Sequence, residues 1–213
     1  MSFPIVTIWR EALESKRFRI HLFLSIFFLL LCAFTAPILF QFIQKRQGFI
    51  LNDYLLDWLP AFDLSLWTFI QLYFLIFLGI SSLLSYPHRL LITLQAYILL
   101  TVWRFVTILL IPLEPPRNII ELIDPFVQHL LYQQSVTKDL FFSGHTSLLA
   151  LLTLAIPSPK TRIVLITGTL LIASMLLIQH AHYTVDVILA PFFSWMAFVT
   201  VKKFSIKKAP ALH

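Results

Sequence analysis

The chain has 213 residues, of which 59% are hydrophobic and 12% are charged, whereas soluble domains carry roughly 25% charged residues. Its apolar runs are too long for a soluble core, so the composition excludes a soluble globular protein and indicates an integral membrane protein. The formal net charge is +6, but the basic residues lie between apolar segments, so nucleic-acid binding is not expected. The single cysteine, Cys32, excludes an internal disulfide.

The first 19 residues mix apolar and charged side chains and show no cleavable signal peptide. We expect residues 1–19 to form an amphipathic cytoplasmic segment on the membrane surface. Six apolar stretches follow, each near the about 17–25 residues that cross a bilayer: 20–42, 64–85, 90–111, 143–157, 163–178 and 185–201. The sequence predicts an all-α integral membrane protein, with a bundle of six transmembrane helices in one domain over residues 20–201 and a basic cytoplasmic tail at 202–213.

The 16 Lys and Arg residues are divided unevenly between the two sides of this predicted bundle. Eleven lie in the N-terminal segment, the 86–89 and 158–162 loops and the tail, and four lie in the 43–63 and 112–142 connections. Arg104 lies inside the third span. Because cytoplasmic loops are enriched in Lys and Arg, both termini are predicted to be cytoplasmic. The connections at 43–63, 112–142 and 179–184 then face the periplasm, lumen or exterior.

Ionisable residues from three separate regions fall at one depth on the outer side of this topology, where they indicate a functional site. In "HAHYTVD", His182 and Asp186 are four residues apart and would share one face of a helix. The carboxylate could then orient one imidazole nitrogen and leave the other to attack or abstract a proton. The alternative is a buried structural hydrogen bond.

The second region is "SGHT", where a polar cluster starts the fourth span. Ser143 is expected to be the N-cap, and Gly144 to leave space for an anion at the helix N-terminus. His145 would lie beside that anion and protonate a leaving oxygen. The alternative is a polar cap that places a histidine in the membrane interface.

Arg104 is the third component, because a guanidinium can hold two phosphate oxygens bidentately. The alternative is a structural cation that reaches the interface or pairs with Glu114 or Glu121. His180 and His182 would point about 200° apart on a helix, so we expect no metal site and give His180 a supporting polar role. No cofactor-binding motif is present in the sequence, and no cofactor is expected.

The motifs "DLFFSGHT" and "HAHYTVDV" together resemble the paired signatures of the sphingomyelin synthase-like family, a branch of the type-2 phosphatidic acid phosphatase superfamily. "WRFVTILLIPLEPP" resembles the third-span motif of that family, and Asp53 and Asp57 resemble its Asp-x-x-x-Asp pair before the second span. The resemblance extends over most of the chain from about residue 50 onward. The broader superfamily signature, Lys-x6-Arg-Pro, is missing, as it is in the synthase branch.

The resemblance implies a six-helix fold with an outward-facing site and a His–His–Asp triad. His182 would be the nucleophile that becomes a phosphohistidine and Asp186 its orienting partner, while His145 would protonate the leaving diacylglycerol and then activate the acceptor. Asp139 would support His145 or cap its helix, and Tyr183 would be a further supporting residue. The reaction would move phosphocholine from phosphatidylcholine to ceramide.

Two other functions are consistent with the same residues. With water as the acceptor, the site would belong to a lipid phosphate phosphatase or a phospholipase C-like hydrolase. A non-enzymatic transporter or scaffold would use His and Asp as a proton relay, but it should need charge pairs spread across the bilayer. The 112–142 loop resembles the animal synthases less closely, so the headgroup and the acceptor stay open.

Overall fold

The computed structural model describes residues 4–124 and 136–207, and the regular secondary structure in these ranges is helical. One isolated β-bridge joins Phe49 to Leu113. The all-α prediction is therefore confirmed. The helices are α1 (Pro4–Glu14), α2 (Lys16–Lys45), α3 (Tyr54–Trp58), α4 (Ser65–Leu83), α5 (Pro87–Leu110), α7 (Gly144–Ala155), α8 (Pro159–Ile178) and α9 (Thr184–Lys207).

Five of these helices, α2, α4, α5, α8 and α9, are long and apolar enough to cross a membrane. Their side chains support this reading, because Phe23, Phe34 and Ile38 of α2 are 70%, 75% and 71% exposed. Large apolar side chains exposed in such numbers fit contact with lipid and not with water. The structure thus indicates a multi-pass integral membrane protein.

Helix α7 differs from the predicted fourth span, because it has only 12 residues. It begins after the N-cap Ser143 and ends before Pro157, since a proline disfavours the helical conformation of the residue that precedes it. Twelve residues rise about 18 Å, less than the about 30 Å of the hydrocarbon core. A sixth full-length span is therefore not shown in the described residues.

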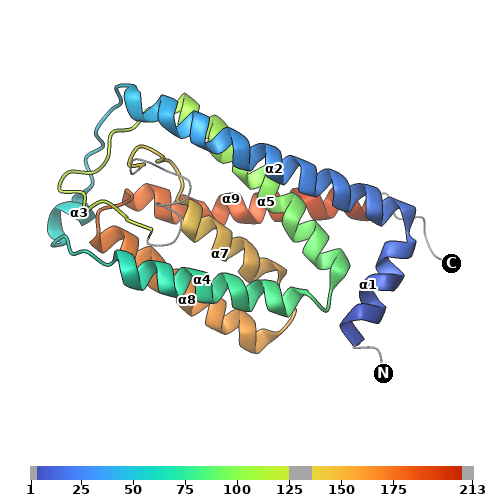
Figure 1. Ribbon diagram of the computed structural model, residues 1–213. Coiled ribbons are helices and arrows are strands. Elements are labelled where there is room, and N and C mark those ends of the chain that lie inside the picture. Colours follow the sequence, from blue (N-terminus) through green and yellow to red (C-terminus); the bar gives the residue numbers. More distant parts are fainter. Residues whose placement is uncertain (1–3, 125–135, 208–213) are drawn as a thin grey trace.

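The short helix α7 occupies the middle of the bundle (Figure 1), where it packs against α4, α5, α8 and α9. Helices α2 and α5 pair on one side, and α4 and α8 pair on the other. The α4–α8 contact needs a glycine, because a Cβ on Gly168 would lie 2.4 Å from Cδ1 of the buried Leu75. Helix α3 lies at one end of the bundle, and α1 lies at the other with the last turns of α9 (Figure 1).

The N-terminal segment is helical over most of its described residues. It forms helix α1, and a new helix starts at Lys16 because the Ser15 side chain accepts a hydrogen bond from Phe18 N–H. Helix α1 is tied to the bundle, since Trp9 Nε1 donates to the carbonyl oxygen of Leu84 at 2.8 Å. Helix α9 continues to Lys207, so the first part of the predicted tail is helical, and residues 208–213 lie outside the described residues.

Candidate active site

The structure brings the two histidine motifs together at the N-termini of α7 and α9. Ser143 N–H donates to the carbonyl oxygen of Asp186 at 3.0 Å. Further along the same pair of helices, Ser194 Oγ donates to the carbonyl oxygen of Ser147 at 2.8 Å. Two segments about 40 residues apart in sequence are therefore held side by side by direct hydrogen bonds.

His182 and Asp186 form a buried pair, although not in the way that their spacing predicted. Helix α9 begins at Thr184, so His182 precedes the helix and the two residues do not share a helical face. Instead, His182 Nδ1 lies 3.3 Å from Asp186 Oδ2, which also accepts a hydrogen bond from Tyr183 N–H at 3.2 Å. An Nδ1–H donated to this carboxylate leaves Nε2 as the nitrogen with a lone pair.

Asp53 fixes the start of α9, a role that the sequence analysis missed. Its Oδ2 accepts a hydrogen bond from Thr184 N–H at 2.6 Å, and its Oδ1 accepts one from Thr184 Oγ1 at 2.9 Å. The same side chain caps α3 through the N–H groups of Leu55 and Leu56. The sequence showed Asp53 and Asp57 only as a resemblance to a family pair, and the tertiary contact shows that Asp53 binds the first residue of α9.

Tyr183 and His180 support the site from the loops. The Tyr183 hydroxyl donates to the carbonyl oxygen of Glu114 at 2.9 Å, and burial raises the pKa of this phenol. The His180 ring lies 3.0 Å from the carbonyl oxygens of both Arg117 and Leu59. Among the residues that the structure describes, no group of acidic, His or Cys side chains could hold a metal ion.

His145, in the first turn of α7, faces the buried pair. Its ring centroid lies 6.5 Å from that of His182 and 5.7 Å from that of Phe69 on α4. Within the described part of the chain, its Nδ1 is buried and has no hydrogen-bond partner. The two imidazoles are therefore neighbours, with an unsatisfied nitrogen of His145 in the same region.

Arg104 is bound more extensively than the sequence indicated. Its Nη2 donates to Asp139 Oδ2 at 2.8 Å and to the Asp139 carbonyl oxygen at 2.9 Å, and its Nε donates to the Phe142 carbonyl oxygen at 3.2 Å. Phe141 and Phe142 both have a positive φ, 72° and 43°, so the backbone turns over the guanidinium at this point. Nη1 makes no hydrogen bond among the described residues, so one edge of the guanidinium is available to a ligand.

These contacts correct three sequence interpretations. Arg104 pairs with Asp139 and not with Glu114 or Glu121. Asp139 does not cap α7, because Ser143 is the N-cap. Ser143 is the N-cap, as predicted, and its Oγ accepts from Thr146 N–H at 3.4 Å. The space at Gly144 is filled by arginine and not left for an anion, because a Cβ there would lie 3.0 Å from Arg104 Cζ.

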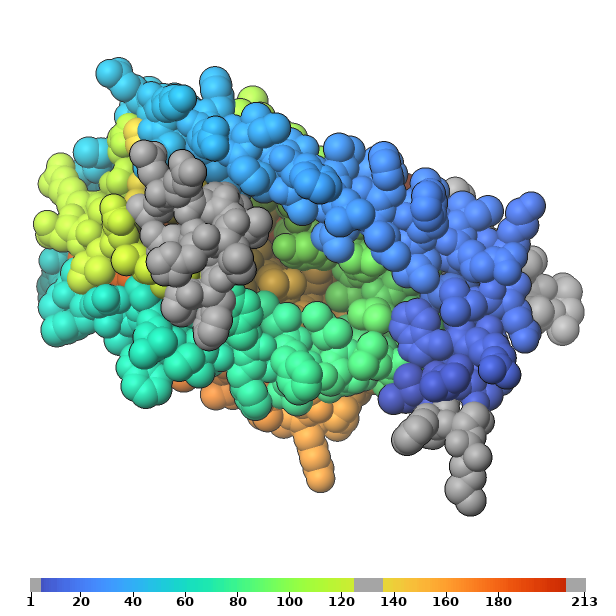
Figure 2. Space-filling model, in the orientation of Figure 1, coloured from blue at the N-terminus to red at the C-terminus, as the bar shows by residue number. Residues whose placement is uncertain are grey.

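A cavity of about 340 Å³ reaches this site from the side of the bundle. Arg104, Asp139 and His145 lie on its wall with small side chains of α2, including Ala33 and Ala36. Figure 2 shows the surface hollowed between α2 and α4, with atoms of α5 and α7 at the base. His182 does not line this cavity and is only 3% exposed, whereas His145 does line it.

Comparison with known proteins finds no curated protein that matches the chain. A family model does match its C-terminal third and includes His145, His182, Asp186 and the Asp139 that holds Arg104. Residues 138–203 are similar to the domain described as PAP2 superfamily C-terminal.

Proposed function

We propose that this protein is a membrane lipid phosphotransferase of the sphingomyelin synthase-like type. It would move a phospho-headgroup, such as phosphocholine from phosphatidylcholine, to a lipid hydroxyl such as that of ceramide. One observation carries the proposal: His145 lies on α7 and His182 lies just before α9, their ring centroids are 6.5 Å apart, and His182 is oriented by a buried carboxylate. The match to the PAP2 superfamily C-terminal domain supports chemistry on lipid phosphates.

In the first half of the reaction, Nε2 of His182 attacks phosphorus and the bond from phosphorus to the diacylglycerol oxygen breaks. His145 gives a proton to that oxygen, so diacylglycerol leaves as a neutral alcohol. The phosphorylated imidazole retains its Nδ1 proton, and its positive charge is stabilised by Asp186 at 3.3 Å. The 6.5 Å between the centroids of His145 and His182 suits this step, since both rings must approach one phosphate ester to about 3–3.5 Å.

In the second half, His145 takes the proton of the acceptor hydroxyl, whose oxygen attacks the phosphohistidine. The bond from nitrogen to phosphorus breaks, and His182 returns to its starting state. Negative charge that develops on the phosphate oxygens is stabilised by the Arg104 guanidinium. Asp139 holds that guanidinium in place at 2.8 Å, so the cation is positioned before substrate binds.

The cavity between α2, α5 and α7 supports a lipid substrate. Its wall combines Arg104 and His145 with apolar side chains such as Leu29 and Phe40, so a phosphate and an acyl chain could be accommodated together. A donor entering here meets Arg104 and His145 first. His182 then becomes reachable through a shift of the His145 ring or of the loop that precedes α9.

The orientation of the site completes the proposal. We expect α7, together with its flanks at 143–157, to form the sixth span, with the site at the side of the bundle that carries few basic residues. Both termini would then be cytoplasmic, and the site would face the periplasm, lumen or exterior. A protease added to sealed vesicles should cleave a site inserted into the 43–63 loop only when that side faces outward.

The reaction is tested by incubating the purified full-length protein with a headgroup-labelled phospholipid, with and without ceramide or diacylglycerol. A labelled acceptor lipid and acid-labile phosphate on His182 are expected. Labelled headgroup released into water, without a labelled lipid product, identifies the hydrolase instead. No covalent phosphate and no product would favour the transporter, and normal transfer by a folded His182→Ala variant would refute the mechanism.

A further inference from the structure

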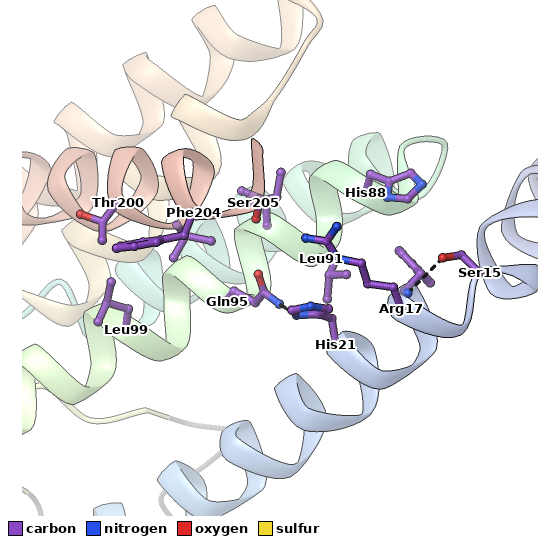
Figure 3. A pocket seen from close by; sticks show the side chains of 13 residues that line it. Ser15, Arg17, His21, His88, Leu91, Gln95, Leu99, Thr200, Phe204 and Ser205 are labelled. Carbon is purple, nitrogen blue, oxygen red and sulfur yellow. Dashed lines mark hydrogen bonds between the residues drawn. The ribbon is translucent and has the colours of Figure 1, made fainter. Parts of the chain in front are cut away.

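A second cavity lies at the opposite end of the bundle from the candidate active site. It has a volume of about 570 Å³ and is enclosed by the beginnings of α2 and α5 and the end of α9 (Figure 3). His88 on its wall and Arg104 are 16 residues apart on α5, which corresponds to about 24 Å along the helix. The two cavities are therefore separate, and the reaction proposed above does not use this one.

One part of the wall is rich in hydrogen-bond donors. Arg17 and His21 extend from α2 toward α5 and α9, and Ser205 approaches from α9 (Figure 3). Gln95 Nε2 lies 3.4 Å from His21 Nδ1. Because an amide nitrogen only donates, His21 Nδ1 is the acceptor, and the proton of a neutral ring is on Nε2. A guanidinium, an imidazole N–H and a hydroxyl together suit the oxygens of a phosphate.

Another part of the wall is apolar. Leu99 lies one helical turn beyond Gln95 toward the middle of the bundle, and Val201 and Phe204 lie on the neighbouring α9. Phe204 is 64% exposed, so the apolar side of the cavity continues onto the surface that faces lipid. The cavity is therefore polar near the ends of the helices and apolar toward the middle of the bundle. This arrangement fits an amphiphile better than a free ion.

The positive charge at this end of the protein favours a lipid whose headgroup is negatively charged. Ten basic residues within the described ranges lie at this end, against only the two acids Glu11 and Glu14. The other eight Asp and Glu residues of the chain all lie toward the end with the candidate active site. Basic clusters at a membrane surface attract anionic lipids. The basic residues are Arg10, Lys16, Arg17, Arg19, Arg89, Lys160, Arg162, Lys202, Lys203 and Lys207.

We propose that this cavity is a binding site for an anionic phospholipid from the leaflet at the basic end of the bundle. Arg17 and His21 hold the phosphate, and one acyl chain follows Leu99 and Phe204. A lipid in this position joins α2, α5 and α9 and stabilises the folded protein. The proposal is independent of the catalytic function, because it concerns binding at the end of the bundle remote from His145 and His182.

The test is thermal unfolding of the full-length protein in detergent with dioctanoyl phosphatidylglycerol as the probe. At about 100 times its Kd, the probe should raise the Tm by about 5 °C, whereas inorganic phosphate should not. Arg17→Gln should weaken the apparent Kd of the probe about tenfold through loss of a charge-assisted hydrogen bond. Ser205→Trp should do the same by filling the cavity, without any change of charge.

The matched control is Lys160→Gln, which removes one positive charge at the same end but outside the cavity. It should keep the Kd of the unaltered protein. An equal loss in Lys160→Gln would show diffuse surface binding and overturn the proposal. An unchanged Kd in Ser205→Trp, or an equal response to inorganic phosphate, would overturn it too. Should Arg17→Gln fail to fold, Ser205→Trp still decides the outcome.

Discussion

Gly144→Ala offers a sharp test of how Arg104 is positioned. The added Cβ would lie 3.0 Å from Arg104 Cζ and 3.2 Å from its Nε and Nη1. Ordinary contacts between such atoms are about 3.5–4.0 Å, so the guanidinium must move by about 0.5 Å or more. That movement lengthens the 2.8 Å hydrogen bond to Asp139 and misplaces the Nη1 edge that we assign to the phosphate.

The expected result is a loss of activity without a loss of fold. A misplacement of about 1 Å can cost about 100-fold in rate, so a shift of about half that distance should lower kcat/KM about tenfold, or by about 1.4 kcal/mol. Alanine is a better helix former than glycine, so the Tm should not fall. Transfer of a fluorescent headgroup in detergent micelles measures the rate, and thermal unfolding measures the fold.

Gly79→Ala is the matched control, because it also adds a Cβ 3.0 Å from its nearest neighbour, but away from Arg104. Its Cβ would lie 3.0 Å from Cδ1 of Leu152, in the apolar contact between α4 and α7. This variant should keep kcat/KM and change only the Tm. Wild-type kcat/KM in Gly144→Ala, or an equal loss in Gly79→Ala, would refute the reasoning about Arg104.

Three further predictions follow from the contacts described above. Asp186→Asn should lower turnover about 10⁴-fold, because it no longer fixes the His182 tautomer, and near-normal turnover would contradict that role. Asp53→Ala should lower the Tm by about 2–4 °C through loss of about 1 kcal/mol of capping at Thr184, measured by thermal unfolding; an unchanged Tm would exclude a capping role. The Lys138 ammonium lies 2.8 Å from the Glu114 carboxylate and holds the pKa of Glu114 below its usual value. This pair therefore stabilises the fold above the pKa that Glu114 has in the unfolded state. The stabilisation is lost as pH falls through the lowered pKa of the folded state. Lys138→Gln should therefore be less stable than the parent protein at pH 7 and equally stable below about pH 3, and a difference in Tm that does not change with pH would contradict this.

The sequence determined the helices and much of the site. Long apolar runs can be satisfied in a bilayer only as helices, so the spans now seen as α2, α4, α5, α8 and α9 were predictable from composition alone. Ser143 was recognisable as an N-cap because capping is a local interaction within one turn. Placing the ionisable residues at one depth also predicted that the motifs of His145 and His182 would meet.

Only the tertiary structure decided the contacts between elements far apart in the chain. The preference of Arg104 for Asp139, 35 residues away, depends on the turn at Phe141 and Phe142, which no local pattern specifies. The same holds for Asp53, whose carboxylate reaches Thr184 across 131 residues. The periodicity of a sequence predicts which face of a helix is apolar. Which side chain of another helix fills the space beside that face depends on how the helices pack. Gly144 was therefore predicted to leave room for an anion, and in the folded protein that room is occupied by a guanidinium.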